Sequence, residues 1–148
     1  MVDRFSTFTV LVDKLKRFIR KIKTEEIAEF KLKSPHVSCL YYLYRYKSLT
    51  SKELAEICDE DKASISRSLD YLEEYGFVHC DTDVRKRYKS PFLLTEKGSE
   101  VASRIIEKVD RILDLSSIGL TEEERAIVYR GMAVIAENLE RICEGYDE

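Results

Sequence analysis

Two short helical patterns in tandem, between Thr50 and Gly76, constrain the fold of this chain more than any other feature. The first, at residues 51–58, keeps its apolar residues on one side, as an amphipathic helix requires. Thr50 and Glu53 stand at the spacing of a capping box, in which a hydroxyl and a carboxylate satisfy the free amides of a helix start. Asp61 is a suitable N-cap for the second helix, which we expect to stop at Gly76.

The second helix of the tandem has two faces with different chemistry. Ile65, Leu69 and Leu72 form an apolar stripe that would pack on the rest of the domain. The opposite and flanking positions are small or polar: Ala63, Ser64, Ser66, Arg67 and Asp70. Hydroxyl groups bond base edges or phosphates and an arginine can bind guanine through two hydrogen bonds, so this face suits the major groove of DNA. The alternative is an ordinary solvated helix face.

A short basic hairpin is predicted after the two helices. We expect one strand that begins at residues 77–78, a second at residues 90–94, with Pro91 suited to an edge strand, and a short first strand around residues 48–49. The loop of the hairpin is rich in positive charge, with Arg85, Lys86, Arg87 and Lys89. Long cationic side chains at such a tip can enter a minor groove or clamp phosphates. Thr95 would then cap the next helix.

The order of these elements resembles the winged helix–turn–helix of the MarR family (multiple antibiotic resistance regulators). The resemblance is carried by Thr50-x-x-Glu53-Leu54-Ala55, Ser64-Ile65-Ser66-Arg67, Leu72-Glu73-x-x-Gly76-Phe77-Val78, Asp83-x-Arg85 and Leu94-Thr95-x-x-Gly98. It implies a dimeric bacterial or archaeal transcription regulator. The wing departs from the family pattern Asp-x-Arg-Asp-x-Arg, because Lys86 replaces the second acid and Tyr88 the last arginine. The minor-groove contact is therefore open between Arg85 and Arg87.

Long amphipathic helices are predicted on both sides of this lobe. Apolar residues recur every three to four positions over residues 5–22, and again in two stretches after Gly98. A second capping box, at Thr121 and Glu124, would open the last helix. Three such helices cannot bury their apolar stripes on so small a lobe, so a twofold homodimer is the simplest solution.

The predicted fold is mostly α with a small β wing, an α+β winged helix–turn–helix with long terminal dimerisation helices. We expect residues 1–33 and 99–148 to form a helical dimerisation region. Residues 34–98 would form the DNA-binding lobe, with the helix–turn–helix at about 50–75 and the wing at about 77–94.

A tyrosine-rich helix is predicted to begin at Ser34-Pro35, with proline in its first turn. We expect its buried side to comprise Val37, Leu40, Tyr41 and Tyr44. The tyrosines would pack in the core or the subunit interface, each hydroxyl reaching a partner or water. The alternative is a pocket for a small aromatic or phenolic effector, a partner that the resemblance implies.

Net charge and hydropathy bear on the class of partner. The 148 residues carry a net charge of −3 and a pI near 5.6, which argues mildly against nucleic-acid binding, although a local basic patch decides contact. The acidity keeps open a different function, a winged-helix module for protein–protein interaction without DNA binding. No apolar run is long enough to span a membrane and charged residues interrupt the first apolar stretch, so we expect a cytoplasmic protein without a membrane partner.

Catalytic and metal-binding patterns are not found in the sequence. The cysteines, Cys39, Cys58, Cys80 and Cys143, have no CxxC spacing, so we expect free and mostly buried thiols. A zinc site would need His36 and His79 to converge with them, and no residue pattern reveals the lowered thiol pKa of a redox-active cysteine. With no phosphate-binding glycine loop and no nucleophile–base pair, we expect no metal, no cofactor and no enzymatic activity.

The function predicted from these features is a MarR-type, sequence-specific transcriptional regulator. It would bind double-stranded DNA at a pseudo-palindromic operator as a homodimer, act as a repressor, and have release by a small ligand as its candidate mode of control. The predicted DNA-binding residues are Ser51, Lys52, Lys62, Ser64, Ser66, Arg67, Arg85, Lys86, Arg87 and Lys89.

Overall fold

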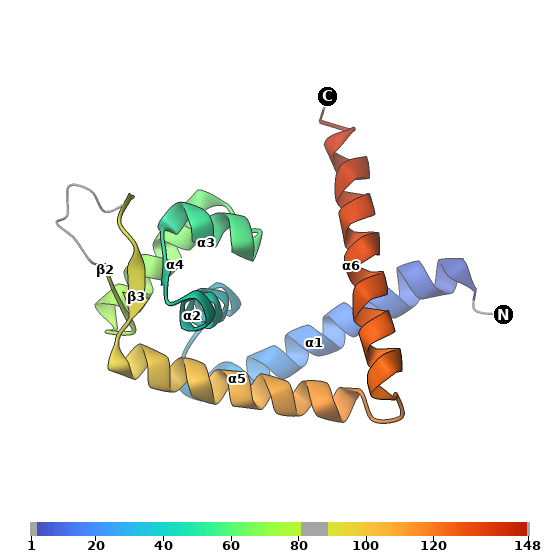
Figure 1. The fold of residues 1–148 in the computed structure, drawn as a ribbon, viewed down its shortest axis with the longest axis horizontal. Helices are drawn as coiled ribbons and strands as arrows, with labels where there is room; N and C mark the ends of the chain where they lie inside the picture. The colour runs from blue at the N-terminus through green and yellow to red at the C-terminus, as the bar shows by residue number, and fades with distance from the viewer. Residues whose placement is uncertain (1–2, 81–88, 148) are drawn as a thin grey trace. The chain divides into compact units, whose positions relative to one another are not determined.

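The computed structural model describes residues 3–80 and 89–147, and over those residues the chain is mostly helical with one small antiparallel sheet (Figure 1). This confirms the predicted fold class. A π-helical turn, Ser6–Leu11, leads into α1 (Val12–Ile27), and a 3-10 turn, η2 (Ala28–Phe30), follows it. The remaining elements are α2 (Ser34–Tyr46), β1 (Ser48–Leu49), α3 (Ser51–Cys58), α4 (Lys62–Glu74), β2 (Val78–Cys80), β3 (Phe92–Leu94), α5 (Glu96–Ser116) and α6 (Glu122–Glu144).

The chain forms two compact units, Met1–Lys108 and Val109–Glu148. The first contains α1 to α4, the sheet and the first half of α5, and the second contains the end of α5 and α6. The assignment of residues 1–33 and 99–148 to dimerisation concerns the assembly and stays a prediction. Among the helices of the described residues, none combines the length and the apolar character that crossing a membrane requires.

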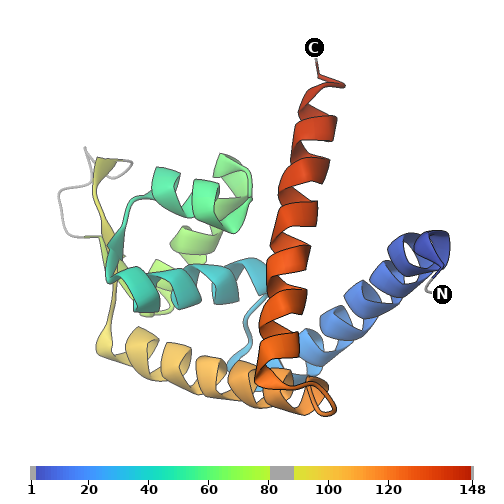
Figure 2. The same cartoon turned by 45° about the vertical axis from the view of Figure 1, so that its right-hand side comes forward.

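The core of the first unit lies where α2, α3 and α4 pack together beside the sheet, as Figures 1 and 2 show from two directions. The apolar stripe predicted on α4 is confirmed, since Ile65, Leu69 and Leu72 are all buried. Leu54 of α3 and Leu40 of α2 are fully enclosed in the same cluster. Burial of these side chains holds the two helices of the tandem against α2, which fixes the direction in which the outer face of α4 points.

The sheet has the strand order β1-β3-β2, with β3 paired antiparallel to both neighbours. Leu93 lies opposite Ser48 on one side and His79 on the other. The prediction that Pro91 marks an edge strand is wrong, because β3 is central among the described strands. Pro91 precedes the first residue of β3, so the ladder does not need an N–H from it.

Helix α2 buries a different side from the one predicted. Leu40 is buried as expected, but Tyr41 is 38% exposed, and the buried residues are His36, Cys39, Leu40 and Leu43. Val37 and Tyr44 are only partly buried against the core. The start of the helix explains part of this rotation. The Lys33 N–H donates to His36 Nδ1 at 3.0 Å, so the ring of His36 caps the helix and turns inward.

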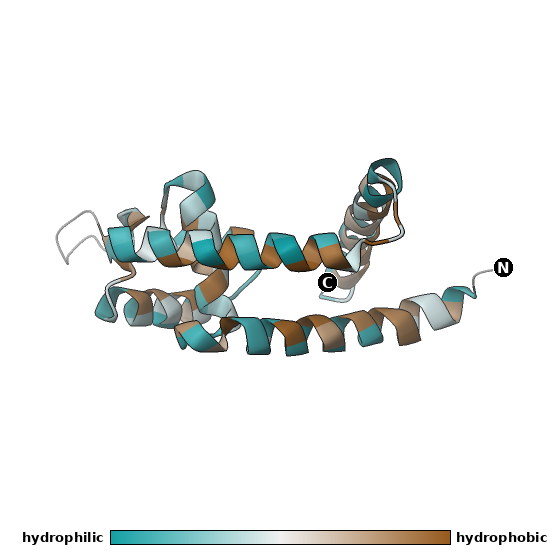
Figure 3. Cartoon of the chain, turned by 90° about the horizontal axis from the view of Figure 1, so that it is seen from below, coloured by the Kyte–Doolittle hydropathy of each residue, from teal (hydrophilic) through white to brown (hydrophobic). Residues whose placement is uncertain are grey.

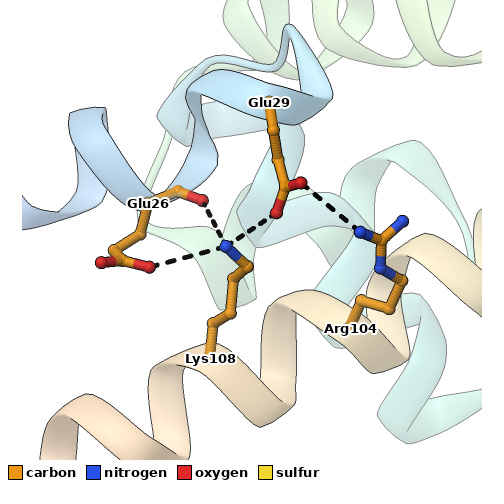
Figure 4. Close-up of polar contacts among 4 residues, drawn as sticks. All are labelled: Glu26, Glu29, Arg104 and Lys108. Atoms are coloured by element: carbon orange, nitrogen blue, oxygen red, sulfur yellow. Dashed lines mark hydrogen bonds and ion pairs between the residues drawn. The ribbon is translucent and has the colours of Figure 1, made fainter.

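An ion cluster joins the end of the N-terminal helix to α5 within the first unit (Figure 4). Lys108 Nζ lies 2.7 Å from Glu29 Oε1 and 3.6 Å from Glu26 Oε2. Arg104 reaches the other carboxylate oxygen of Glu29 at 3.4 Å, and its guanidinium lies 5.0 Å from the ring centroid of Phe30. Mutual attraction lowers the pKa of Glu29, mainly through the hydrogen bond from Lys108, and raises the pKa of Lys108.

The terminal helices carry many apolar side chains that the chain by itself leaves exposed. Figure 3 shows apolar segments recurring along α1 and α5. On α1 and the turn before it the exposed residues are Phe8, Val10, Leu11, Val12, Leu15, Phe18, Ile19 and Ile22. On α6 they are Ile127, Val128, Tyr129, Met132, Val134, Ile135, Leu139 and Ile142, and α6 has no buried residue.

Candidate nucleic-acid interface

The helix–turn–helix is set up by two N-terminal caps that the sequence predicts correctly. At the start of α3, Thr50 Oγ1 accepts from the Glu53 N–H at 3.2 Å, and Glu53 Oε2 accepts from the Thr50 N–H at 2.7 Å. At the start of α4, Asp61 Oδ1 accepts from the Ser64 N–H at 2.8 Å. The hydrogen bonds from Thr50 also lower the pKa of Glu53. Both acidic side chains thus accept hydrogen bonds from backbone N–H groups at their own helix starts.

The turn between α3 and α4 depends on one residue in the left-handed region. Asp59 has φ 52° and ψ 47°, a conformation that a short polar side chain tolerates better than a branched one. The Glu60 N–H donates to the Ala55 carbonyl oxygen at 3.1 Å, which closes the last turn of α3. The chain then reaches the Asp61 cap at once, so the angle between the two helices is fixed by local hydrogen bonds.

The outer face of α4 brings together the side chains that the sequence selects for base contact. Lys62, Ser66 and Arg67 are exposed near the start of the helix, while Ser64 is partly buried. Within the described residues, no carboxylate forms an ion pair with Lys62 or Arg67. Long cationic side chains and a hydroxyl group on the first two turns of a helix are the groups with which proteins contact the base edges and phosphates of a DNA duplex.

The start of α3 presents a second, smaller polar surface. Lys52 is exposed and Ser51 is partly buried, both in the first turn of the helix. N–H groups of a first turn lack partners within the helix and attract anions such as phosphate. Lys52 adds a full positive charge beside those groups.

The wing is only partly described. Arg85, Lys86 and Arg87 lie outside the described residues, so their roles stay predictions. Lys89 is described and exposed, directly before the buried Ser90. The sheet places residues 80 and 89 near the outer end of β2 and β3, since Cys80 pairs with Phe92.

The sequence pattern does not predict one contact that positions α4, which is made by the ring of His36. The ring of His36 stacks on Tyr71 of α4 with 4.3 Å between centroids and 4° between planes. Tyr71 also donates from its hydroxyl to the Lys31 carbonyl oxygen at 2.9 Å and packs on Tyr75. Burial lowers the pKa of His36, with a smaller effect from the charge of Lys33. The only sequence signal is the three-residue spacing between Lys33 and His36, which resembles that of a capping box.

The cysteine and histidine side chains are of the types that a zinc site would use. In residues 3–80 and 89–147, no three His, Cys, Asp or Glu side chains gather closely enough to hold a metal ion. The cysteines are free, with Cys39 buried, Cys58 and Cys80 partly buried, and Cys143 exposed. Cys58 and Cys80 are more accessible than the buried thiols that the sequence favoured.

Comparison with known proteins finds the MarR family in the central lobe and regulators of similar sequence along most of the chain. The sequence model of the MarR family matches residues 30–87, which span α2 to the wing. The HTH-type transcriptional regulator YwaE of Bacillus subtilis is 23% identical over 138 residues, covering 93% of this chain and 81% of its own length.

Solved structures extend this likeness to the terminal helices. A crystal structure of MarR is 27% identical, with a TM-score of 0.73, and the match covers 96% of this chain and 97% of that one. MepR of S. aureus, solved as a complex with DNA, has a TM-score of 0.79 at 17% identity, with 93% and 99% of the two chains covered. The capped helix pair, the three-stranded wing sheet and these matches agree: residues 30–87 match the MarR family, and the chain has the fold of MarR-type winged-helix transcriptional regulators.

Proposed function

We propose that this chain regulates transcription by binding a pseudo-palindromic DNA operator sequence-specifically as a homodimer. The observation that carries the proposal is the exposed start of α4, where Lys62, Ser66 and Arg67 project from a helix held by the Asp61 cap. A helix–turn–helix inserts its second helix into the major groove with its N-terminal residues against the base edges. A rigid cap and a buried apolar stripe give this helix the fixed orientation that such insertion needs.

Each exposed residue of α4 has a role that its chemistry suggests. Arg67 would donate two hydrogen bonds to a guanine, because its planar guanidinium matches the O6 and N7 acceptors. Ser66 would bond a base edge or a phosphate, and Ser64 would do so at the rim, where it is partly buried. Lys62 would neutralise a phosphate at the groove edge.

Residues outside α4 would hold the duplex without reading its sequence. Ser51 and Lys52 stand in the first turn of α3, where the helix N–H groups favour a phosphate. Lys89 extends the positive surface to the wing, and Arg85, Lys86 and Arg87 would reach the neighbouring backbone or minor groove. These contacts set affinity and its dependence on salt.

The homodimer is supported by the apolar residues that α1 and α6 leave exposed. Side chains such as Phe8 at 47%, Phe18 at 46% and Ile127 at 70% exposure would be buried by a second subunit. The twofold axis of such a dimer would place the two α4 helices on half-sites about one helical turn of DNA, roughly 34 Å, apart. The fold likeness to a protein solved with DNA is consistent with this arrangement.

Release of the dimer from its operator would depend on the distance between its two α4 helices. As a repressor in the cytoplasm, the dimer would leave its operator when a small aromatic or phenolic effector favours a spacing of the heads that does not fit the half-sites. Such a ligand has to bind the two dimer states unequally, since equal binding shifts nothing. Tyr41 and Tyr46 of α2 are exposed aromatic side chains on which such a ligand would stack.

A salt titration of DNA binding tests the proposal. Fluorescence anisotropy with the full chain and an operator duplex measures the association constant at several salt concentrations. Its logarithm should fall linearly with the logarithm of the salt concentration, with a slope of roughly −0.9 for each phosphate neutralised. Replacing Lys52 and Lys62 by Ala should flatten that slope by about two phosphate contacts. Duplex binding that is absent or has no salt slope would reject DNA regulation, and would favour the protein-interaction module that the acidic net charge of −3 keeps in view.

A further inference from the structure

The segment between the N-terminal helix and α2 is bonded to the second half of α4. Tyr71 of α4 donates from its hydroxyl to the Lys31 carbonyl oxygen at 2.9 Å. The ring of His36, in the first turn of α2, stacks on the Tyr71 ring with 4.3 Å between centroids and 4° between planes. The Lys33 N–H donates to His36 Nδ1 at 3.0 Å. Together these three contacts form the Tyr71 clamp.

The clamp meets α4 close to the place where α1 and α5 are joined. Lys31 is the C-cap of the 3-10 turn that follows α1, and its backbone is left-handed with φ 54°. In the same turn, Glu29 Oε1 lies 2.7 Å from Lys108 Nζ of α5 (Figure 4). Lys108 Nζ also donates to the Glu26 carbonyl oxygen at 3.4 Å. Because α1 and this part of α5 belong to the proposed dimerisation region, the clamp connects that region directly to the helix proposed to read DNA.

We propose that Tyr71 and His36 are positioning residues, which hold α4 in the orientation that reads DNA as long as His36 is neutral. This inference rests on the proposed function. Tyr71 lies four positions after Arg67, about one helical turn along the same side of α4. A shift of Tyr71 therefore tilts or rotates the face that carries Arg67. His36 is 7% exposed and acts on α4 only through the Tyr71 ring.

Protonation of His36 opens the clamp. Nδ1 accepts the Lys33 N–H and so carries no hydrogen, whereas an imidazolium has a hydrogen on both nitrogens. The new hydrogen would face the Lys33 N–H, and the ring has to turn away from Tyr71 to avoid it. Burial lowers the pKa of His36, followed by the charge of Lys33, and within the described residues Tyr71 is the titratable group stacked on the ring. The clamp is thus closed at neutral pH and is lost as the pH falls through the lowered pKa of folded His36.

Hydrogen–deuterium exchange of the free, full-length protein tests the clamp without DNA. Tyr71→Phe keeps the stacked ring and removes only the hydroxyl that bonds Lys31. We expect faster exchange both in residues 28–37 and in α4, because the two segments lose their common hydrogen bond. Tyr75→Phe is the matched control, since its exposed ring packs on Tyr71 and its hydroxyl has no hydrogen bond within the described residues. Unchanged exchange in both segments of Tyr71→Phe would overturn the clamp.

Operator binding tests the positioning role of Tyr71. Anisotropy titrations compare an operator duplex with a duplex of scrambled sequence. For Tyr71→Phe we expect about threefold to tenfold weaker binding to the operator, the effect of one lost hydrogen bond, and unchanged binding to the scrambled duplex, which is held through its phosphates. A residue needed only for folding would weaken both duplexes by the same factor. An equal loss on both duplexes, or no loss on either, would overturn the positioning role.

The pH profile of operator binding tests the role of neutral His36. Affinity of the wild type should be constant above about pH 7 and fall toward about pH 5.5, while circular dichroism shows the protein still folded. Protonation of other groups adds positive charge and strengthens DNA binding, so this fall has the opposite sign to a general charge effect. His36→Gln offers an acceptor to the Lys33 N–H that does not titrate, so its weaker affinity should not fall further at low pH. A wild type without the fall, or the same fall in His36→Gln, would overturn this role.

The three measurements separate this inference from the proposed function. A wild-type protein that binds no duplex would overturn DNA regulation, and the exchange experiment would still decide whether the clamp holds α4. Operator binding that neither Tyr71→Phe nor low pH weakens would overturn the inference and leave DNA regulation intact.

Discussion

Gly98, in the first turn of α5, lies directly on the backbone of Phe77. A Cβ on residue 98 would stand 2.8 Å from the Phe77 carbonyl carbon and would overlap the carbonyl oxygen. That oxygen also accepts from the Thr95 N–H at 3.0 Å, and Thr95 Oγ1 donates to the Gly76 carbonyl oxygen at 2.6 Å. The start of α5 is thereby fixed to the segment between α4 and the wing, so a substitution at Gly98 should destabilise the whole lobe.

We expect Gly98→Ala to lower the free energy of unfolding by about 1–3 kcal/mol, because the backbone of Phe77 has to move to admit the methyl group. Glu100→Ala, on an exposed position of the same helix, is the control and should change stability by no more than about 0.5 kcal/mol. Urea unfolding followed by circular dichroism measures both. Equal stability of the two variants would show that α5 does not rest on Phe77.

Glu29→Gln should lower the melting temperature slightly at low salt, because Lys108 and Arg104 lose their shared carboxylate. The groups are exposed, so about 1 M NaCl should remove most of the difference from the wild type by screening. Glu25→Gln, a nearby residue without an ion pair in the described part of the chain, is the control. A difference in melting temperature that persists in high salt would indicate that Glu29→Gln acts through lost packing and not through lost charge.

Stability should fall as the pH is lowered through about 6.5, the ordinary pKa of histidine, toward the lower pKa of folded His36. In this window the unfolded chain binds a proton that the folded chain resists, so stability rises with pH. Protonation also puts a hydrogen on Nδ1, which now accepts the Lys33 N–H. His36→Gln should flatten the pH profile of urea midpoints between about pH 5 and 7. A profile that His36→Gln does not alter would assign the pH dependence to other groups.

Arg67→Ala should reduce discrimination between the operator and mutated duplexes by about 1–3 kcal/mol, if the guanidinium binds a guanine. Arg67→Lys is the matched control, because it keeps the charge but cannot form two parallel hydrogen bonds. We expect the lysine variant to retain the salt dependence and lose the discrimination. Anisotropy titrations on paired duplexes measure both quantities, and unchanged discrimination in both variants would remove Arg67 from base reading.

Truncation after Leu120 removes α6 with its exposed apolar residues and should abolish the homodimer. The first unit, Met1–Lys108, retains its own core, so the helical signal of the lobe should survive. Analytical ultracentrifugation of both chains measures the assembly. A truncated chain that sediments as a stable dimer would place the subunit interface elsewhere.

The sequence by itself determined the features that depend on neighbouring residues. The caps at Thr50, Asp61 and Thr121 and the left-handed turn at Gly76 follow from the preferences of a few adjacent residues. The apolar stripe of α4 follows from helical periodicity, because three residues spaced by three or four positions must share a face. The order of these local elements was enough to predict the resemblance to the MarR family and the exposed face of α4 that carries Arg67.

Only the tertiary structure decided which side of α2 is buried and that β3 lies between its neighbours. Each of these depends on contacts between residues far apart in the chain. In α2, tyrosines and apolar residues occupy every face, so periodicity leaves its rotation open, and packing against α3 and α4 selects one orientation. The physical reason is that local propensity fixes where a helix begins and ends, whereas burial of the shared core fixes how the helix is turned.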